Sequence, residues 1–506
     1  MDNELMFIDI ETTGLEPEHD NILSIGYIIG AGTDKQEYTL IDCYHNTITK
    51  EDLLFLKDYK LVGRNLTFDV GFLNYHYDLD LEVFIDTLVV AHLDEPYEKV
   101  LNLKDQAVKH LKVKKWNENT FGLTNLAKKK AKSMGEITYI FKEPYSQNFE
   151  QEFLDEVYQA LVDYMRLDVL YDRDLFNLQM SRLEQCEKVL ARKLTRIKTV
   201  YDLKLDPYIV DHEKLEKIRV EYKARIDVLE KQLKARNPKL NLNSPKQLVE
   251  FIENVLKIEI TERTKTGNKS VGKSSIKAML RQYPGHPWLK DYLEYKALYK
   301  KYSGFIMSII DIDSFKPKFS VVGTHTGRTT CSKPNMQQIP NGDLKKIFKA
   351  PPGYTRVEAD YSQIELRIAT HVAKVSKMRE AFINGRDLHT ETTISFYGEN
   401  FTKVQRNIGK TANFGLLYGM GVETFHKYLL DRDVVVTKHE AEKAHRKFFE
   451  TYPELNDYYD MVEQWYVKEG RWKHPSGRIY KVDPVLFQYN ANACRGSAIN
   501  APVQGL

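Results

Sequence analysis

Apolar residues in the first 180 positions form short continuous runs and then recur at helical spacing. Residues 5–10 (LMFIDI) and 22–30 (ILSIGYIIG) have the length and composition of buried strands, and residues 36–44 alternate well enough for a third strand. Helical patterns follow around residues 83–92 and 151–180. Strands followed by helices in this way predict one α/β domain over about residues 1–180.

The middle of the chain has a helical, highly charged pattern. Residues 181–236 are predicted as helices with a turn near Asp206. At residues 241–246 (NLNSPK), Asn243 or Ser244 can cap a helix that starts with Pro245. Residues 261–277 are polar, contain glycine and hold five basic residues against one acid, so we expect a mobile basic loop. Such a loop either binds a phosphate backbone or is simply solvated, and the rest of the sequence favours phosphate.

Strand-like runs return in the second half. They cover residues 318–323 (KFSVVG) and 354–360 (YTRVEAD), and long helical patterns extend over residues 387–468. Two short runs on either side of Gly477 predict a hairpin within residues 470–484. Residues 490–506 are predicted as a helix.

Composition narrows the class of protein. A chain of 506 residues suggests three or four domains, and a hydrophobic content of 42% supports a large core. The net charge of +3 excludes a histone-like polycation. No apolar run approaches the ~20 residues of a membrane span, and an acidic residue follows Met1. We therefore expect a soluble, cytoplasmic protein without a membrane partner. The four cysteines are too far apart for a zinc or disulfide framework.

Charge is distributed unevenly along the chain. Residues 1–100 carry −15 and the remaining residues carry +18. The acidic first hundred residues fit metal binding and the basic remainder fits polyanion binding. Two solvated surfaces of opposite charge explain the distribution equally well.

Four carboxylates and a tyrosine stand out in the first domain. Asp9 and Glu11 end the first strand two residues apart, so they share one face. Asp69 follows Asn65 by four residues, and Asp168 follows Tyr164 by four residues on a predicted helix. Clustered carboxylates repel one another unless cations lie between them, and Mg²⁺ or Mn²⁺ prefers such oxygen ligands. Each motif is common by itself, and only their order within one domain favours function.

Taken together, D-x-E, N-x3-D and Y-x3-D in this order resemble the DEDD 3′–5′ exonucleases of the tyrosine-containing subclass. The resemblance implies that two metal ions are held by Asp9, Glu11, Asp69 and Asp168. It also implies that Tyr164 helps to place the attacking water and that Asn65 contacts DNA.

A second group of residues lies in the segment 406–419 (RNIGKTANFGLLYG). Arg406, Lys410, Phe414 and Tyr418 follow one another at intervals of four and form one stripe on a helix. Two cations followed by two aromatic rings suit a nucleoside triphosphate. For an isolated segment, a helix with an exposed basic end and a buried aromatic end would be the simpler interpretation.

Other motifs accompany this stripe. They are THTGR at 324–328, PNMQQIP at 334–340, DYSQIELR at 360–367 and DLH at 387–389. Together with the stripe they closely resemble the family A DNA polymerases, of the bacterial DNA polymerase I type, over nearly the whole chain. The resemblance implies a right-hand architecture: an RNase H-like α/β exonuclease domain, a helical thumb, and helical fingers on an α+β palm. The expected divisions are exonuclease 1–185, connecting helices and thumb 186–310, palm 311–385, fingers 386–484, and the start of a palm helix 485–506.

The same resemblance implies roles for individual residues. Asp360 would ligate both catalytic metals, and Glu365 would act as a steric gate against a ribose 2′-OH, with Gln363 beside the nucleotide. His389, Arg406 and Lys410 would bind the triphosphate, and Lys410 is a candidate proton donor to pyrophosphate. Phe414 would pack on the sugar and base, and Tyr418 would stack beside the template. Expected DNA contacts are Arg328, Asn335, Gln337, Asn500, Gln504 and the thumb residues Lys265, Lys269 and Lys273.

One expected element of the family is missing from the sequence. Family A polymerases carry a second palm carboxylate in a His-Asp motif, and no His-Asp pair follows residue 20 of this sequence. Asp360 alone would hold two metals poorly. We therefore expect the N-terminal part of a split, phage-like enzyme, unstable or adhesive by itself, in which a second chain completes the palm. A truncated expression product and an interrupted gene are the alternatives.

Three functions from different classes follow. The first is a proofreading DNA polymerase subunit whose partners are primer–template DNA, dNTPs and the second chain. The second is a stand-alone 3′–5′ exonuclease whose remaining domains only bind DNA, and the third is a non-catalytic scaffold. The complete carboxylate set argues against a scaffold, and the triphosphate stripe argues against a stand-alone exonuclease.

Overall fold

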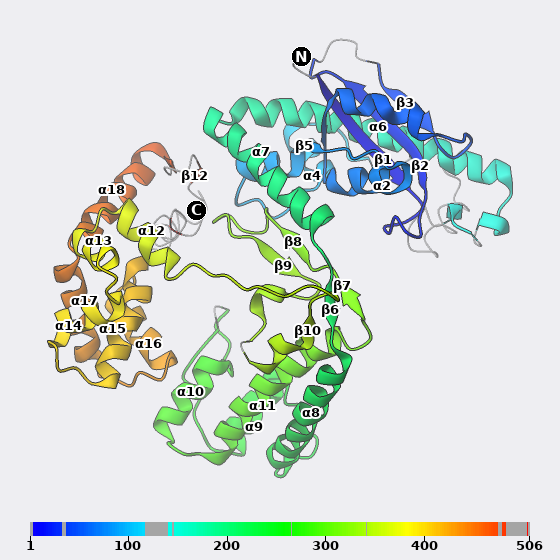
Figure 1. Ribbon diagram of the computed structural model, residues 1–506. Helices are drawn as coiled ribbons and strands as arrows, with labels where there is room; N and C mark the ends of the chain where they lie inside the picture. Colours follow the sequence, from blue (N-terminus) through cyan, green and yellow to red (C-terminus); the bar gives the residue numbers. More distant parts are fainter. Residues whose placement is uncertain are drawn as a thin grey trace. The chain divides into compact units, whose positions relative to one another are not determined.

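The computed structural model describes residues 4–32, 37–116, 140–143, 146–264, 266–340, 342–473, 478–481 and Val503. The chain forms two compact units (Figure 1). The first comprises Met1–Leu205, Phe319–Thr330 and Val462–Leu506, and the second comprises Asp206–Lys318 and Cys331–Met461. The finer division into five parts stays a prediction, and the helix expected over residues 490–506 lies outside the described residues apart from Val503.

A five-stranded mixed sheet forms the centre of the first unit. Its strand order is β3-β2-β1-β4-β5. The central strand β1 runs antiparallel to β2 and parallel to β4. The strands are β1 (Leu5–Thr12), β2 (Ile22–Ile29), β3 (Thr39–Asp42), β4 (Lys60–Gly63) and β5 (Val83–Asp86). The three strands predicted over the first 44 residues are thereby confirmed.

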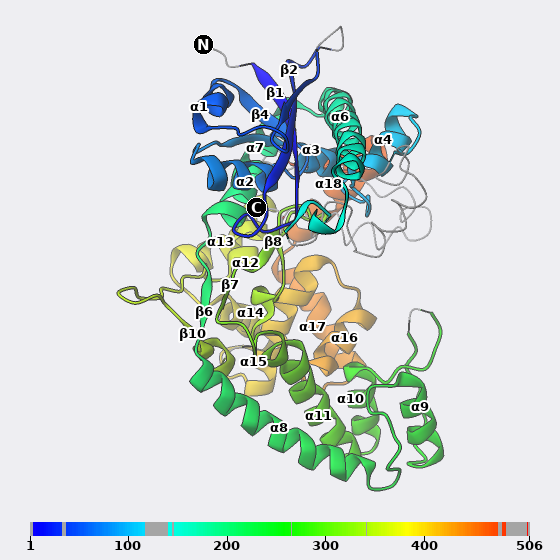
Figure 2. The ribbon, with the colours of Figure 1, turned by 90° about the vertical axis from the view of Figure 1, so that its right-hand side faces the viewer.

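The alternation of side chains along β1 decides which residues face which helix layer. Met6, Ile8 and Ile10 pack toward α2 (Thr67–Tyr77), whereas Phe7 packs toward α6 (Gln151–Arg182). Figure 2 shows the sheet nearly edge-on with α1 and α2 on one side and α6 on the other. Because side chains two residues apart share a face, Asp9 is directed to the α6 side.

The remaining helices of this unit are α1 (Lys50–Leu53), α3 (Thr87–Asp94), α4 (Leu103–Leu111) and α7 (Gln185–Thr199). The helix predicted over residues 83–92 is wrong in its first part, which forms β5. Residues 83–85 are β-branched or aromatic and favour a strand. The Asp86 carboxylate then accepts a hydrogen bond from the Leu88 amide and starts α3 at Thr87. Farther along the chain, β11 (Arg471–Lys473) and β12 (Ile479–Lys481) pair antiparallel, which confirms the predicted hairpin.

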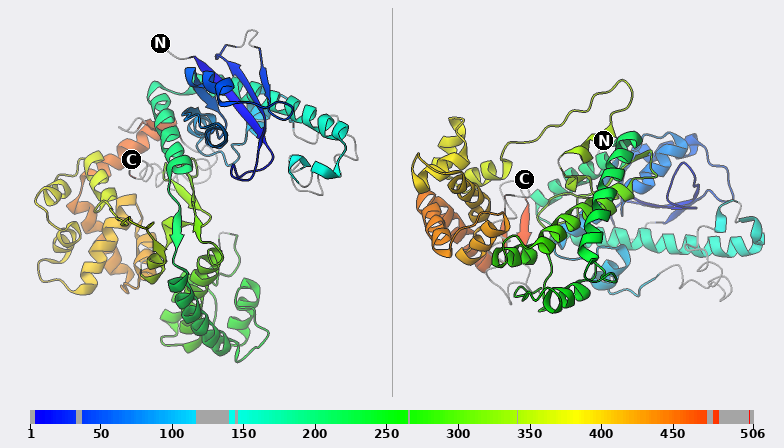
Figure 3. Two further views of the ribbon diagram at one scale, coloured as in Figure 1. Left: turned by 45° about the vertical axis from the view of Figure 1, so that its right-hand side comes forward. Right: turned by 90° about the horizontal axis from the view of Figure 1, so that it is seen from below.

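The first half of the second unit is a helical layer next to a small sheet of strand order β10-β6-β7. Its helices are α8 (His212–Lys234), α9 (Pro245–Asn254), α10 (Lys273–Gln282) and α11 (Pro287–Gly304), and its strands are β6 (Tyr208–Val210), β7 (Ser314–Phe315) and β10 (Phe348–Lys349). Figure 3 shows α8 and α11 side by side. The Ser244 hydroxyl caps α9 by accepting a hydrogen bond from the Gln247 amide, and Pro245 is the first helical residue, as predicted.

The predicted basic loop 261–277 is correct only in its first part. Lys273 and Lys277 lie in α10, not in a loop. The reason is that Ile276 and Met279 follow at helical spacing and pack into the core between α8 and α11.

Among the described residues after 363, the chain forms the helices α12–α18. They are α12 (Ile364–Val372), α13 (Ser376–Ile383), α14 (Leu388–Tyr397), α15 (Lys403–Gly415), α16 (Val422–Asp431), α17 (Lys438–Thr451) and α18 (Glu454–Glu469). The long helical region predicted over residues 387–468 is confirmed. None of the helices in the described part of the chain is long and apolar enough to cross a membrane.

The strand predicted over residues 354–360 is not formed. The segment is irregular, and its large side chains are exposed: Tyr354 to 76%, Val357 to 84% and Tyr361 to 78%. A strand is stabilised by its ladder partner and by packing on one face, and among the described residues no strand pairs with this segment. Sequence propensity alone was therefore insufficient here.

Candidate active sites

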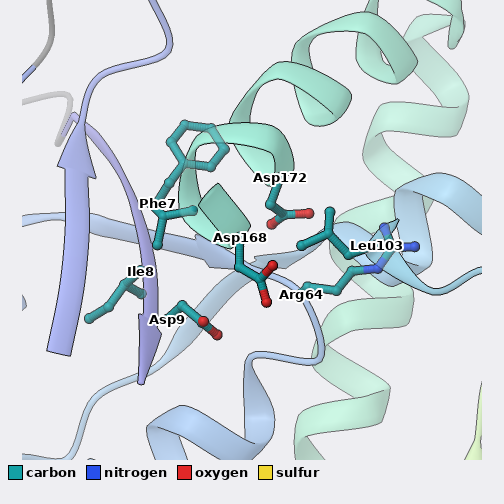
Figure 4. Close-up of a pocket in the computed structure, with 8 residues that line it drawn as sticks. Phe7, Ile8, Asp9, Arg64, Leu103, Asp168 and Asp172 are labelled. Carbon is teal, nitrogen blue, oxygen red and sulfur yellow. The ribbon is translucent and has the colours of Figure 1, made fainter. Parts of the chain in front are cut away.

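Asp9 lies in a small cavity between β1 and α6. The cavity has a volume of about 150 Å³, and its lining includes Arg64, Asp168 and Asp172. Figure 4 shows Asp168 and Asp172, one turn apart on α6, with Asp9 on the neighbouring strand. The strand face and the helix face predicted from the sequence thus bring two of the four predicted carboxylates to one cavity.

Asp9 is repelled by the negative charges of nearby carboxylates. Burial raises the pKa of Asp9 well above its ordinary value, and Asp69, Glu11, Asp168 and Asp172 raise it further. Each of the other three predicted carboxylates therefore acts on Asp9 through space. A group of this kind binds protons or cations strongly, because either relieves the repulsion.

Asp69 reaches the same strand from α2. Its Oδ1 accepts a hydrogen bond of 2.9 Å from the Ile10 amide, between Asp9 and Glu11. Burial raises the pKa of Asp69 to about 8 even though this hydrogen bond lowers it. The bond fixes the second motif against the first.

Asp168 and Tyr164 share a second partner element, α4. The Trp116 indole donates to Asp168 Oδ1 at 2.6 Å, and Lys104 Nζ lies 4.0 Å from Asp168 Oδ2. Lys104 also donates a hydrogen bond to the Tyr164 hydroxyl. Neither Lys104 nor Trp116 was found from the sequence, because they follow no local spacing relative to Tyr164 and Asp168.

A fifth carboxylate, Asp172, was also missed. It is buried and accepts a hydrogen bond of 2.6 Å from the Thr87 hydroxyl. Burial raises the pKa of Asp172 to about 6, against the opposing effect of Arg64. Its position four residues after Asp168 continues the Tyr164–Asp168 stripe, so the helical spacing contained the signal.

Asn65 has an internal role in the structure. Its backbone amide donates to Asp86 Oδ1 at 3.0 Å, and its side-chain oxygen accepts from Lys198 Nζ at 3.0 Å. Lys198 is buried and also contacts Thr67 and Asp202. The DNA contact expected of Asn65 stays a prediction.

The carboxylates around Asp9 are candidate ligands for a divalent cation. Several carboxylate oxygens converge near Asp9, which suits a hard ion such as Mg²⁺. Within the described residues, however, no three acidic, histidine or cysteine side chains already stand in a ligand arrangement. The residues fit the ion by the chemistry of their oxygens and by their proximity to Asp9.

The basic end of the predicted nucleotide stripe lies on α15. Thr402 and Gln405 form a capping box that starts this helix. Arg406 donates to Asp387 at 2.7 Å, and Asp387 in turn caps α14. Lys410 is exposed, and among the described residues it has no hydrogen-bond or ion-pair partner.

The aromatic end of the stripe meets other predicted residues. The Phe414 ring lies 5.3 Å from the ring of His389, centre to centre. Tyr418 lies in the 3-10 turn after α15, Leu416–Tyr418, and donates a hydrogen bond to Glu365. The structure therefore brings Glu365, His389 and the stripe together, although they are up to 53 residues apart.

Asp360 and Gln363 lie at the start of α12. Asp360 is exposed in the irregular segment, and Gln363 precedes the helix with a left-handed backbone (φ 54°). No group of three or more acidic, histidine or cysteine side chains in the described part of the chain forms a ligand arrangement that includes Asp360.

The expected DNA contacts vary in their surroundings. Arg328, Asn335 and Gln337 are exposed, Lys273 is exposed at the start of α10, and Lys269 forms an ion pair with Glu253. Lys265, Asn500 and Gln504 lie outside the described residues. DNA binding by all of these residues stays a prediction.

Comparison with known sequences decides the family. The profile of DNA polymerase family A matches residues 212–506, more than half of the chain. The chain belongs to DNA polymerase family A. The resemblance seen in its motifs is thereby confirmed at the level of the family.

Relatives of this polymerase chain include DNA polymerase I of Helicobacter pylori strain J99. The two are 28% identical over 465 residues, which cover 88% of this chain and 47% of the relative. DNA polymerase I of Aquifex aeolicus is 26% identical over 513 residues, 99% of this chain and 82% of the relative. The chain spans about half the length of the curated relatives it matches first.

A solved structure shares the fold. It is the POL domain of Pol1 from M. smegmatis in complex with DNA primer-template and dNTP. It is 22% identical, with a TM-score of 0.76, and the match covers 99% of this chain and 83% of that chain.

Proposed function

We propose that this chain is part of a template-directed DNA polymerase that also removes nucleotides from DNA 3′ ends. Membership of family A supports synthesis. The observation that carries the proposal is the contact between Tyr418 and Glu365, which joins the α15 stripe to the start of α12 next to Asp360. A triphosphate site and a carboxylate at one place are what nucleotidyl transfer requires.

The nucleotide site follows from the chemistry of the stripe. Arg406, Lys410 and His389 would bind the triphosphate, with Lys410 as the candidate proton donor. Phe414 and Tyr418 would contact the sugar, base and template, and Gln363 and Glu365 would border the sugar. A guanidinium and an ammonium one turn apart match the spacing of successive phosphates.

The exonuclease site would use the carboxylate cluster around Asp9. Asp9, Glu11, Asp69 and Asp168 would hold two Mg²⁺ or Mn²⁺ ions. Those ions, when bound, supply an activated water and stabilise the attacking and leaving oxygens of phosphodiester hydrolysis. Lys104 restrains the Tyr164 phenol, and we assign to Tyr164 the orientation of the attacking water.

Synthesis would need a further palm segment. Tyr354, Val357 and Tyr361 expose a run of apolar side chains next to Asp360. We propose that a strand from a second polypeptide pairs with residues 354–360, covers these side chains and adds the second carboxylate. The exposed apolar segment supports this proposal, because such surfaces are normally covered.

A primer assay tests both activities. The 506-residue chain is incubated with a labelled primer–template and Mg²⁺, with and without dNTPs. We expect the primer to shorten and not to lengthen, and Asp9→Ala to abolish shortening while the exposed control Asp80→Ala does not. Lengthening by the chain alone would contradict the need for a second polypeptide, and no shortening in any condition would contradict the exonuclease.

The exposed position of Asp360 in an irregular segment favours one alternative, a stand-alone exonuclease whose other parts only bind DNA. Binding of dNTP separates the two functions. The polymerase proposal expects binding that weakens about tenfold in Lys410→Ala but not in Lys403→Ala, an exposed control on the same helix. If no dNTP binds at millimolar concentration, the stand-alone exonuclease is favoured.

A further inference from the structure

Asn413, a residue between the members of the α15 stripe, is fully buried and contacts His389. Its Nδ2 lies 3.0 Å from His389 Nδ1, and its Oδ1 lies 2.9 Å from the Thr392 hydroxyl. The Thr392 hydroxyl lies 2.7 Å from the Tyr452 hydroxyl. A buried chain of polar groups therefore runs from Tyr452 to the imidazole, with Asn413 as its last member.

Close packing of α14 and α15 makes this contact possible. Gly409 lies one turn before Asn413, and a Cβ atom at Gly409 would lie 2.2 Å from the Thr393 hydroxyl. Any side chain at Gly409 would push the helices apart. The separation that glycine permits is the one at which the Asn413 amide reaches the imidazole.

The direction of the Asn413–His389 hydrogen bond sets the tautomer of the imidazole. An amide nitrogen only donates, so His389 Nδ1 accepts and the proton of the neutral ring is on Nε2. Burial, assisted by Lys410 and Arg406 and opposed by Asp387, lowers the pKa of His389, so the ring is neutral at neutral pH. Among the described residues Nε2 has no hydrogen-bond partner.

If the Asn413 amide were flipped, the neutral imidazole of His389 would adopt the other tautomer. If Oδ1 faced the ring, the proton would move to Nδ1, and Nε2 would present a lone pair. A lone pair repels a phosphate oxygen, whereas an N–H donates to it. The Leu388 carbonyl oxygen, 3.4 Å from Asn413 Nδ2, favours the observed orientation, because it accepts from an amide nitrogen and would repel an amide oxygen. The Thr392 hydroxyl lies 2.9 Å from both Asn413 Oδ1 and the Leu388 carbonyl oxygen.

We infer that Asn413 is a positioning residue that holds His389 in the Nε2–H tautomer, so that a neutral imidazole donates a hydrogen bond to a phosphate of the incoming nucleotide. The inference rests on the proposed nucleotide site and adds a residue and a protonation state to it. The Thr392 and Tyr452 hydroxyls extend the buried hydrogen-bond network that holds Asn413.

Nitrogen NMR of the full chain with ¹⁵N-labelled histidine tests the tautomer directly. The His389 signals are assigned by their loss in His389→Gln. We expect the Nε2–H tautomer in the parent chain, and a shift to protonated Nδ1 in Asn413→Asp, whose carboxylate only accepts. Asn456→Asp, an exposed control on α18, should leave the His389 signals unchanged. A parent chain with protonated Nδ1, or an unchanged tautomer in Asn413→Asp, would overturn the inference.

Binding of dATP and of inorganic triphosphate gives the functional readout. Asn413→Leu is expected to weaken both about tenfold, because the lost contact is to phosphate. Thr392→Val replaces a buried hydroxyl without changing side-chain size and provides a second variant if Asn413→Leu does not fold. If Lys410→Ala loses binding while Asn413→Leu and Thr392→Val keep it, the role of Asn413 is refuted but the nucleotide site is not. No effect of Lys410→Ala would refute the nucleotide site itself.

Discussion

Lys104 donates a hydrogen bond to the Tyr164 hydroxyl, and its ammonium lies 4.2 Å from the centre of the Tyr164 ring. The same ammonium lies 4.0 Å from the Asp168 carboxylate. One lysine thus contacts the tyrosine and the aspartate of the Y-x3-D motif. Its position indicates that it orients both groups.

Replacing Lys104 by methionine should slow primer shortening. The phenol loses its charged donor, and loss of such a hydrogen bond corresponds to roughly 10–100-fold in rate. The measurement is the single-turnover rate of shortening at saturating Mg²⁺. Lys109→Met, on the same helix but paired with Glu95 and Glu98 on the surface, is the control and should keep the parent rate. Equal rates for both variants would exclude an orienting role for Lys104.

Lys198→Met should destabilise the first unit. Lys198 lies 3.4 Å from Asp86, a carboxylate with no exposed surface, and 2.6 Å from Asp202. Removing a buried cation while leaving its partner costs about 3–5 kcal/mol. Urea unfolding followed by circular dichroism measures the loss. The exposed Lys193→Met on the same helix should change the free energy of unfolding by less than about 0.5 kcal/mol, and an equally small change in Lys198→Met would contradict the importance of this network.

The stability contributed by Asp211 should depend on pH. Burial raises its pKa, but hydrogen bonds from the Lys214 amide and ammonium and from Lys349 outweigh burial and lower the pKa to about 2. Since the folded pKa is below the unfolded value, the contribution is present above pH 4 and is lost as the pH falls from about 4 to 2. Asp211 also caps α8.

Urea unfolding of Asp211→Asn at several pH values checks this prediction. The variant should be less stable than the parent by about 1 kcal/mol near neutral pH, and the difference should shrink between pH 4 and pH 2. The exposed Asp206→Asn serves as the control. A difference that is constant over this range would show that the charge of Asp211 contributes nothing.

Lys269 and Lys273 should differ in their effect on DNA affinity. Lys269 is engaged by Glu253, whereas Lys273 is exposed at the first position of α10. Lys273→Ala should therefore weaken DNA binding and reduce the slope of log K against log salt by about 1, with a smaller effect for Lys269→Ala. Fluorescence anisotropy at several salt concentrations measures the slope, and the reverse order would contradict the assignment.

Local periodicity predicted much of the first unit and of its site. Strand alternation placed Asp9 and Glu11 on one face, and the interval of four placed Tyr164 and Asp168 on another. The same interval of four, continued by one step, places Asp172 on the helix face of Asp168. The contacts of Lys104 with Tyr164 and of Lys198 with Asn65 were not predictable, because they join residues 60 and 133 positions apart.

The failed strand at residues 354–360 has a different cause. Its β-branched and aromatic residues favour an extended chain, but strand formation depends on a partner and a packed face. A pattern within one segment contains no information about either. The contact between Asn413 and His389 was missed for a related reason, since Asn413 falls between the residues of the stripe and is aligned with none of them.

The capping box at Thr402 and Gln405 sets the rotational phase of α15. Each residue advances an α-helix by about 100°, so one inserted residue between Thr402 and Arg406 would rotate Arg406, Lys410 and Phe414 away from Asp387 and His389. Substitutions in this segment alter one contact at a time, whereas a change in its length displaces all of them together. The spacing between cap and stripe is therefore a constraint on chain length, separate from any constraint on residue identity.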